Sequence, residues 1–162
     1  MKTNKQGFTV VELLVYSGIL TVFLYVMTNI FISVLDMQLE SETAGPVVQD
    51  SQYILSRFTY DIGRASSIVT PAALGAQTTN LVLHIGASDY TYVVTNGNLL
   101  LTSPSGSAAL NSYGTKVSNV SFRRYGNTNG KNSVRILFTL TSVASRSAGP
   151  DSRDYESTIG LK

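Results

Sequence analysis

The sequence predicts an α+β protein, in which a long N-terminal helix packs on a small antiparallel β-sheet head. An uncharged apolar run occupies residues 13–35, apolar positions recur at helical spacing through residues 36–65, and polar and apolar residues alternate after residue 65. We therefore divide the 162 residues into a polar N-terminal segment (1–7), an apolar helix (8–35), a helical stem (36–65) and a β-rich head (66–162).

Composition narrows the possible functions. The chain contains twelve Lys and Arg and ten Asp and Glu, which gives a net charge of +2. Such a small charge gives no reason to expect bulk electrostatic binding to nucleic acid. The absence of cysteine excludes disulfides, cysteine-based zinc sites and thiol nucleophiles. The single histidine, His84, lies in an expected strand without marked catalytic partners, so we expect a solvated or hydrogen-bonded side chain. We expect no enzymatic activity, no cofactor and no metal.

The apolar run is long enough to cross a membrane. Residues 13–35 would extend ~35 Å as a helix, whereas a hydrocarbon core is about 30 Å thick. The run is longer than the apolar region of an ordinary signal peptide, and no good signal-peptide cleavage site follows it. We therefore expect the run to be retained in the mature protein. Lys2 and Lys5 precede it, whereas Asp36, Glu40 and Glu42 follow it. This asymmetry predicts a single-pass membrane protein with its N-terminus in the cytoplasm and the rest of the chain outside.

A short motif at the start of this run resembles a known family. Lys5-Gln6-Gly7 followed by Phe8-Thr9-Val10-Val11-Glu12-Leu13-Leu14-Val15 is similar to the cleavage and methylation motif of type IV prepilins, which include pilins and pseudopilins. The resemblance implies that prepilin peptidase cuts between Gly7 and Phe8 and methylates the new amine of Phe8. It also implies that residues 1–7 are a leader peptide and that the protein lies in the inner membrane with a periplasmic or extracellular head. Other pilin or pseudopilin subunits are the partners that it implies, in a hetero-oligomeric filament.

Glu12 has two interpretations. A glutamate at the end of an apolar helix can extend its carboxylate toward the membrane interface. In the resembled family, the acid at this position is thought to pair with the N-terminal amine of a neighbouring subunit, which is mostly cationic at neutral pH. A carboxylate inside an apolar filament core requires such a partner. A separate alternative for the chain as a whole is an ordinary signal-anchored protein in which the motif occurs by chance.

The stem has one apolar face, formed by Val47, Ile54, Phe58, Ile62 and Ala65. We expect this face to pack against the head. Gly45-Pro46 predicts a kink or short break in the stem, with Pro46 starting the next helical piece, because proline removes a backbone donor and disfavours helix at the residue before it. Two separate helices are the alternative.

The head is expected to form a small antiparallel sheet, in one or two parts. Strands are expected at residues 81–85, 90–94, 98–101, 117–125, 133–143 and 155–161. Asn96-Gly97 predicts a tight hairpin. Residues 71–79 and 102–115 are rich in small and polar residues and are expected to form loops.

A second resemblance concerns the stem and the last strand. The stretch Asp50 to Ala65, with Tyr53-Ile54-Leu55 and Asp61-Ile62-Gly63-Arg64-Ala65, is similar to the stem of J-type minor pseudopilins and W-type minor pilins. The ending Tyr155 to Leu161 resembles their last strand. This resemblance implies a structural subunit near the tip of a type IV pilus-like or type II secretion filament.

Two side-chain clusters in the head leave alternatives open. Arg123, Arg124, Lys131 and Arg135 gather around one expected hairpin. They could bind an acidic neighbouring stem, or they could belong to a binding module whose head recognises DNA or a surface ligand. A charged, solvated sheet edge is the interpretation that we favour. Asp151, Asp154 and Glu156 offer oxygen ligands for calcium, but a solvated turn is the simpler interpretation.

Overall fold

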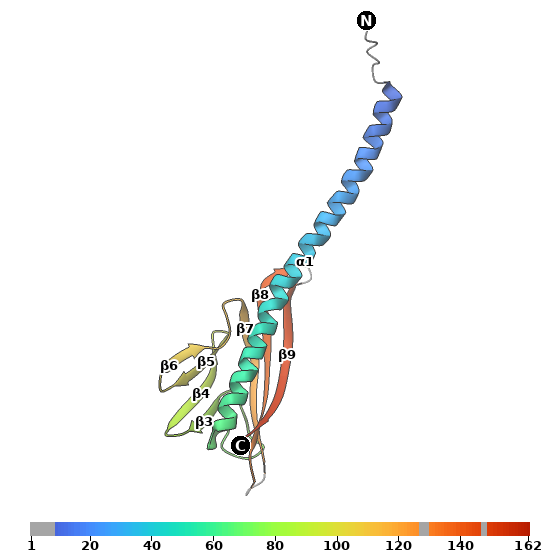
Figure 1. Cartoon of the computed structure of the whole chain (residues 1–162). Helices are drawn as coiled ribbons and strands as arrows, with labels where there is room; N and C mark the ends of the chain where they lie inside the picture. Colours follow the sequence, from blue (N-terminus) through green and yellow to red (C-terminus); the bar gives the residue numbers. More distant parts are fainter. Residues whose placement is uncertain (1–8, 127–129, 147–148) are drawn as a thin grey trace. The chain divides into compact units, whose positions relative to one another are not determined.

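The computed structural model describes residues 9–126, 130–146 and 149–162. It consists of one long helix and nine strands in two antiparallel sheets (Figure 1). This is the α+β class predicted from the sequence. The chain divides into two compact units, one ending at Leu39 and the other spanning Glu40–Lys162.

Helix α1 runs from Val10 to Arg64 and belongs to both units. It continues through Gly45 and Pro46, so the expected break is absent from the secondary structure. Tertiary packing accounts for this continuity, because Thr43 and Val47 on either side are buried and Pro46 lies against the head. A Cβ placed on Gly114 would come within 3.3 Å of the Pro46 Cβ atom, so the glycine permits this close approach.

The first sheet has the order β1-β3-β4-β5-β6, and the second has the order β2-β7-β8-β9. Six of the nine strands were expected from the sequence, with differences at their ends. The bounds of all nine are β1 Ser67–Thr70, β2 Gln77–Thr78, β3 Leu81–Ile85, β4 Ser88–Thr95, β5 Asn98–Ser103, β6 Gly106–Ala109, β7 Thr115–Tyr125, β8 Ser133–Arg146 and β9 Gly149–Gly160.

The two expected loops, residues 71–79 and 102–115, were only partly correct. Strand β2 lies inside the first and pairs with β7, while β6 lies inside the second and pairs with β5. Both strands are short and at sheet edges, where pairing with a neighbour rather than local propensity decides the conformation. The Asn96-Gly97 hairpin is confirmed, with positive φ angles of 53° and 76° at its two turn residues.

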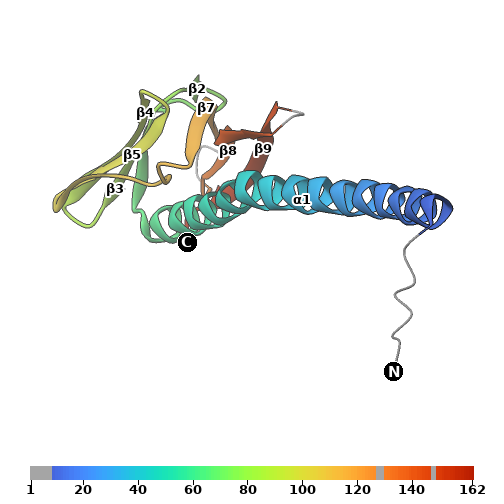
Figure 2. The ribbon, with the colours of Figure 1, turned by 90° about the horizontal axis from the view of Figure 1, so that it is seen from above.

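The core of the head lies between the stem part of α1 and both sheets (Figures 1 and 2). Phe58 from the stem contacts Tyr92 of β4 at 4.7 Å and Phe122 of β7 at 5.7 Å between ring centroids. The predicted apolar face of the stem is confirmed, since all five of its residues are buried.

A buried carboxylate fixes the end of the stem to the first sheet. Asp61 is fully buried and accepts hydrogen bonds from Arg57 Nε at 2.8 Å and from Arg64 Nη2 at 2.7 Å. The Tyr92 hydroxyl of β4 donates to Asp61 Oδ2, the same oxygen that accepts from Arg57. Because a buried charge is unfavourable unless it is paired and hydrogen-bonded, this arrangement satisfies Asp61 only when the stem lies on β4.

A second carboxylate attaches the middle of the stem to the head. Asp50 is nearly buried and accepts hydrogen bonds from the backbone N–H and the hydroxyl of Ser112, each at 2.8 Å, and from the Thr115 hydroxyl. Ser112 lies in the segment that leads into β7, and Thr115 is the first residue of β7. The stem is therefore attached to the head by one carboxylate near its middle and another near its end, with apolar packing between them.

Tyr92 makes the stability of the head sensitive to alkaline pH. Burial, followed by the hydrogen bond to Asp61, raises the pKa of Tyr92 well above its ordinary value of about 10. The stabilisation is therefore complete below pH 10 and is lost as pH rises above it, by up to about 1.4 kcal/mol per pH unit. We predict that Tyr92→Phe flattens this part of the stability curve, measured by near-UV circular dichroism of thermal unfolding in detergent. Parallel slopes for parent and variant between pH 10 and 11 would contradict this prediction.

Candidate functional site

The N-terminal motif lies at the start of α1. Gly7 and Phe8 lie outside the described residues. Glu12 lies in the first helical turn and is exposed. A carboxylate is favoured there because the first turn of a helix carries partial positive charge.

Thr9 caps this helix, a role that was not expected from the sequence. Its hydroxyl oxygen accepts a hydrogen bond from the backbone N–H of Glu12 at 3.2 Å, and its carbonyl accepts one from Leu13. The spacing Thr9-x-x-Glu12 matches a capping-box pattern and could have revealed the helix start. Glu12 therefore stands at a defined helix start as well as in the motif.

The described residues contain one helix that is long and apolar enough to cross a membrane. Its most apolar stretch of 18 residues is not buried at all. The polar side chains along it bond back to carbonyls of the same helix, which reduces the cost of placing them in hydrocarbon. Their donors are the hydroxyls of Ser17, Thr21, Thr28 and Ser33 and the amide of Asn29, at 2.8 to 3.0 Å. This part of α1 thus fits a single-pass membrane protein.

The basic cluster expected from the sequence does not form one surface. Arg123 and Arg124 are consecutive residues of β7, and successive side chains of a strand point to opposite faces of its sheet. Arg124 Nη1 donates to the carbonyls of Ile68, Pro71 and Ala72, the shortest bond being 2.7 Å. Arg124 therefore holds the chain between β1 and β2.

The other three cations have different surroundings. Arg123 Nε donates to the Gly75 carbonyl at 3.1 Å, and its guanidinium lies 5.3 Å from the ring centre of Tyr125. Arg135 Nε pairs with Glu156 at 2.8 Å. Lys131 is exposed beside the loop that precedes β8.

The C-terminal acids lie on strand β9 rather than in a turn, so the expectation of a turn was wrong. Asp151 pairs with Arg153 at 2.9 Å, Asp154 accepts a hydrogen bond from the Thr139 hydroxyl at 2.6 Å, and Glu156 pairs with Arg135. Among the described residues, no group of three or more histidine, cysteine or acidic side chains is arranged to hold a metal ion.

His84 matches its expected surroundings. Its Nδ1 atom lies 2.6 Å from Asp89 Oδ1, directly across the β3–β4 ladder, and both side chains are well exposed. Asp89 of β4 thus provides a hydrogen-bond partner for the Nδ1 atom of the His84 ring.

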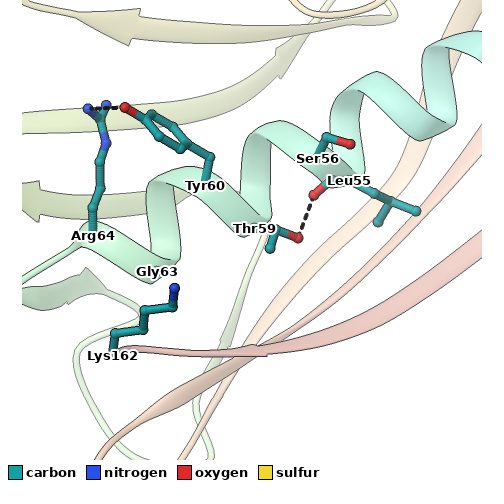
Figure 3. Close-up of a pocket in the computed structure, with 7 residues that line it drawn as sticks. All are labelled: Leu55, Ser56, Thr59, Tyr60, Gly63, Arg64 and Lys162. Carbon is teal, nitrogen blue, oxygen red and sulfur yellow. Dashed lines mark hydrogen bonds between the residues drawn. The ribbon is translucent and has the colours of Figure 1, made fainter.

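An open hollow of about 680 Å³ lies on the outer side of the stem (Figure 3). It is bounded by Leu55, Ser56, Thr59, Tyr60, Gly63, Arg64 and Lys162. The guanidinium of Arg64 lies 4.5 Å from the ring centre of Tyr60, and the Thr59 hydroxyl bonds back to the Leu55 carbonyl. These contacts belong to the stem itself, and the lining contains no acid–base pair with a nucleophile.

Comparison with protein-family models, with curated proteins and with solved structures finds no match to this chain. The sequence motif and the geometry described above therefore carry the functional argument.

We predict that Arg124 contributes to stability, whereas Lys131 does not. Arg124→Ala removes a charged donor from three carbonyls and should lower the free energy of unfolding by about 1–3 kcal/mol. Lys131→Ala, an exposed cation near the same hairpin, should change it by less than about 0.5 kcal/mol. Denaturant unfolding of the detergent-solubilised chain measures both variants. Equal effects would show that Arg124 is a surface cation like Lys131.

Proposed function

We propose that this chain is a structural subunit, a minor pilin or pseudopilin, of a type IV pilus-like or type II secretion filament. The observation that carries the proposal is the make-up of α1, which combines an acid in its first turn, an exposed uncharged apolar run and a stem attached to a β-rich head. Such a helix suits a monomer that is first stored in a membrane and later packed among equivalent helices.

In this proposal the chain is made as a precursor in the inner membrane, with Lys2 and Lys5 on the cytoplasmic side. Prepilin peptidase cuts between Gly7 and Phe8, which removes both lysines and leaves an α-amino group next to the capped start of α1. The chain itself performs no reaction and is the substrate of the peptidase.

In the assembled filament, residues 8–35 pack against the corresponding helices of other subunits. Glu12 pairs with the methylated amine of a neighbouring subunit, because methylation keeps the positive charge and the apolar core requires a counter-ion. The head lies near the filament tip and contacts other minor subunits. The alternative of a DNA-binding head has less support, because Arg124 is held by backbone carbonyls and Arg135 is paired with Glu156, so the four expected cations do not form one basic surface.

The processing step can be tested by the mass of the mature protein. In cells that contain prepilin peptidase, we predict a membrane-extracted chain that begins at N-methylated Phe8. In cells that lack the peptidase, the chain should retain its leader. Intact-mass spectrometry distinguishes the two species, and an unprocessed chain in peptidase-containing cells would refute the proposal.

The role of Glu12 can be separated from its place at the helix start. We predict that Glu12→Gln leaves membrane insertion, cleavage and the helix start intact, because glutamine also suits this capping position. It should nevertheless reduce filament incorporation at least about tenfold, because the neighbouring amine loses its counter-ion. Thr9→Ala is the matched control, since it removes the capping hydroxyl and keeps the charge. Normal incorporation of Glu12→Gln, measured by immunoblot of sheared filaments, would exclude the pairing role.

A further inference from the structure

The outer face of the second sheet carries two arginines side by side. Arg123 of β7 is the direct cross-strand partner of Arg135 of β8, and Gln77 of β2 pairs with Arg123 on the other side. Directly opposed residues in a ladder point to the same face of the sheet. Gln77, Arg123 and Arg135 therefore form one polar row on the face opposite Phe122 and Ile136, which are buried in the core.

Two like charges placed directly opposite each other destabilise a sheet unless an anion offsets them. Glu156 pairs with Arg135 from one side, and this hydrogen bond is the main cause of the raised pKa of Arg135. Among the described residues, Arg123 donates to the Gly75 carbonyl and lies over the ring of Tyr125, and neither of these groups carries a negative charge. The row as a whole thus retains one uncompensated positive charge.

The two arginines border a hollow of about 230 Å³. Gln77 and Ser121 add neutral polar groups to its lining, and Leu137 adds an apolar wall. A hollow of this size with one spare positive charge, polar groups and one apolar side matches the carboxylate and short methylene chain of an acidic residue.

We propose that this hollow binds a single carboxylate side chain from the helical stem of a neighbouring subunit. The ion pair between Arg135 and Glu156 shows that a carboxylate already meets this face at 2.8 Å. The stem of this chain itself carries exposed acidic side chains. Asp50 and Asp61 are buried, so the exposed acids of its stem are all at one end, at Asp36, Glu40 and Glu42.

The arrangement favours a protein carboxylate over a nucleic acid. Binding along a phosphate backbone requires several cations in line, and its affinity falls steeply with salt. On this sheet, Arg124 points to the opposite face and Arg153 is paired with Asp151. One spare charge in a small hollow suits one carboxylate.

The test uses the full-length chain in detergent micelles and a fluorescent peptide with the sequence of residues 36–45, which contains three acids. We expect binding of this peptide but not of a version in which the acids are replaced by Asn and Gln. Arg123→Gln and Arg135→Gln should each weaken binding at least about tenfold. Lys131→Gln, a nearby exposed cation outside the hollow, is the matched control and should leave binding unchanged.

Three results would overturn the proposal. These are equal binding of the amide peptide, equal loss in Lys131→Gln, and retained binding in Arg123→Gln. A 30-base-pair DNA duplex forms the second arm of the experiment. Arginine-dependent binding of the duplex, with a fall of about a thousandfold or more between 50 and 200 mM salt, would assign the face to nucleic acid instead.

The inference rests on the proposed function only for the identity of the partner. The peptide measurement does not depend on processing at Phe8, so the two can fail separately. An unprocessed chain that still binds the acidic peptide would keep the carboxylate site and remove the filament subunit as its source.

Discussion

The buried carboxylate of Asp61 is the constraint on which the arrangement of stem and head depends. A fully buried charge is tolerated only when oppositely charged and hydrogen-bonding groups surround it. Two of these groups, Arg57 and Arg64, come from the same helix at i−4 and i+3, so they are present whenever the stem is helical. The third, Tyr92, comes from β4, so the carboxylate is fully satisfied only in the docked head. Apolar packing around Phe58 supplies the attraction, and Asp61 selects the position at which it occurs.

This constraint also redistributes the charge of the stem. By sequence, residues 36–65 carry five acids and two arginines, which predicts an acidic stem beneath a basic head. In the folded unit, Asp61 is neutralised by both arginines and Asp50 is enclosed by the segment that leads into β7. The exposed acids are left at residues 36–42, next to the apolar run. The charge on the surface of the stem therefore differs from the average charge of the segment.

The sequence predicted the helix more accurately than it predicted the strands and side-chain contacts of the head. Residues 13–35 and the apolar face from Val47 to Ala65 could be predicted because helical periodicity is a local property of the chain. The break expected at Gly45-Pro46 was wrong, because burial of Thr43 and Val47 and the contact with Gly114 outweigh the missing backbone donor. Strands β1, β2 and β6 were missed because they are short and their conformation depends on pairing with β3, β7 and β5 rather than on local propensity. The four cations around the β7–β8 hairpin were treated as one cluster, although strand alternation and the carbonyls around Arg124 separate them.

The sequence by itself determined the α+β class, the membrane-length apolar run, the position of Glu12 at its start and the apolar face of the stem. Each of these features depends on residue types and on their spacing over a short stretch of the chain. Only the tertiary structure decided that α1 is continuous through Pro46, that Asp50 and Asp61 are buried attachments, and that Arg123 faces Arg135 while Arg124 points inward. The physical reason is that burial, cross-strand register and ion pairing join residues that are distant in the chain. Their energies exist only after the stem and the two sheets have come together.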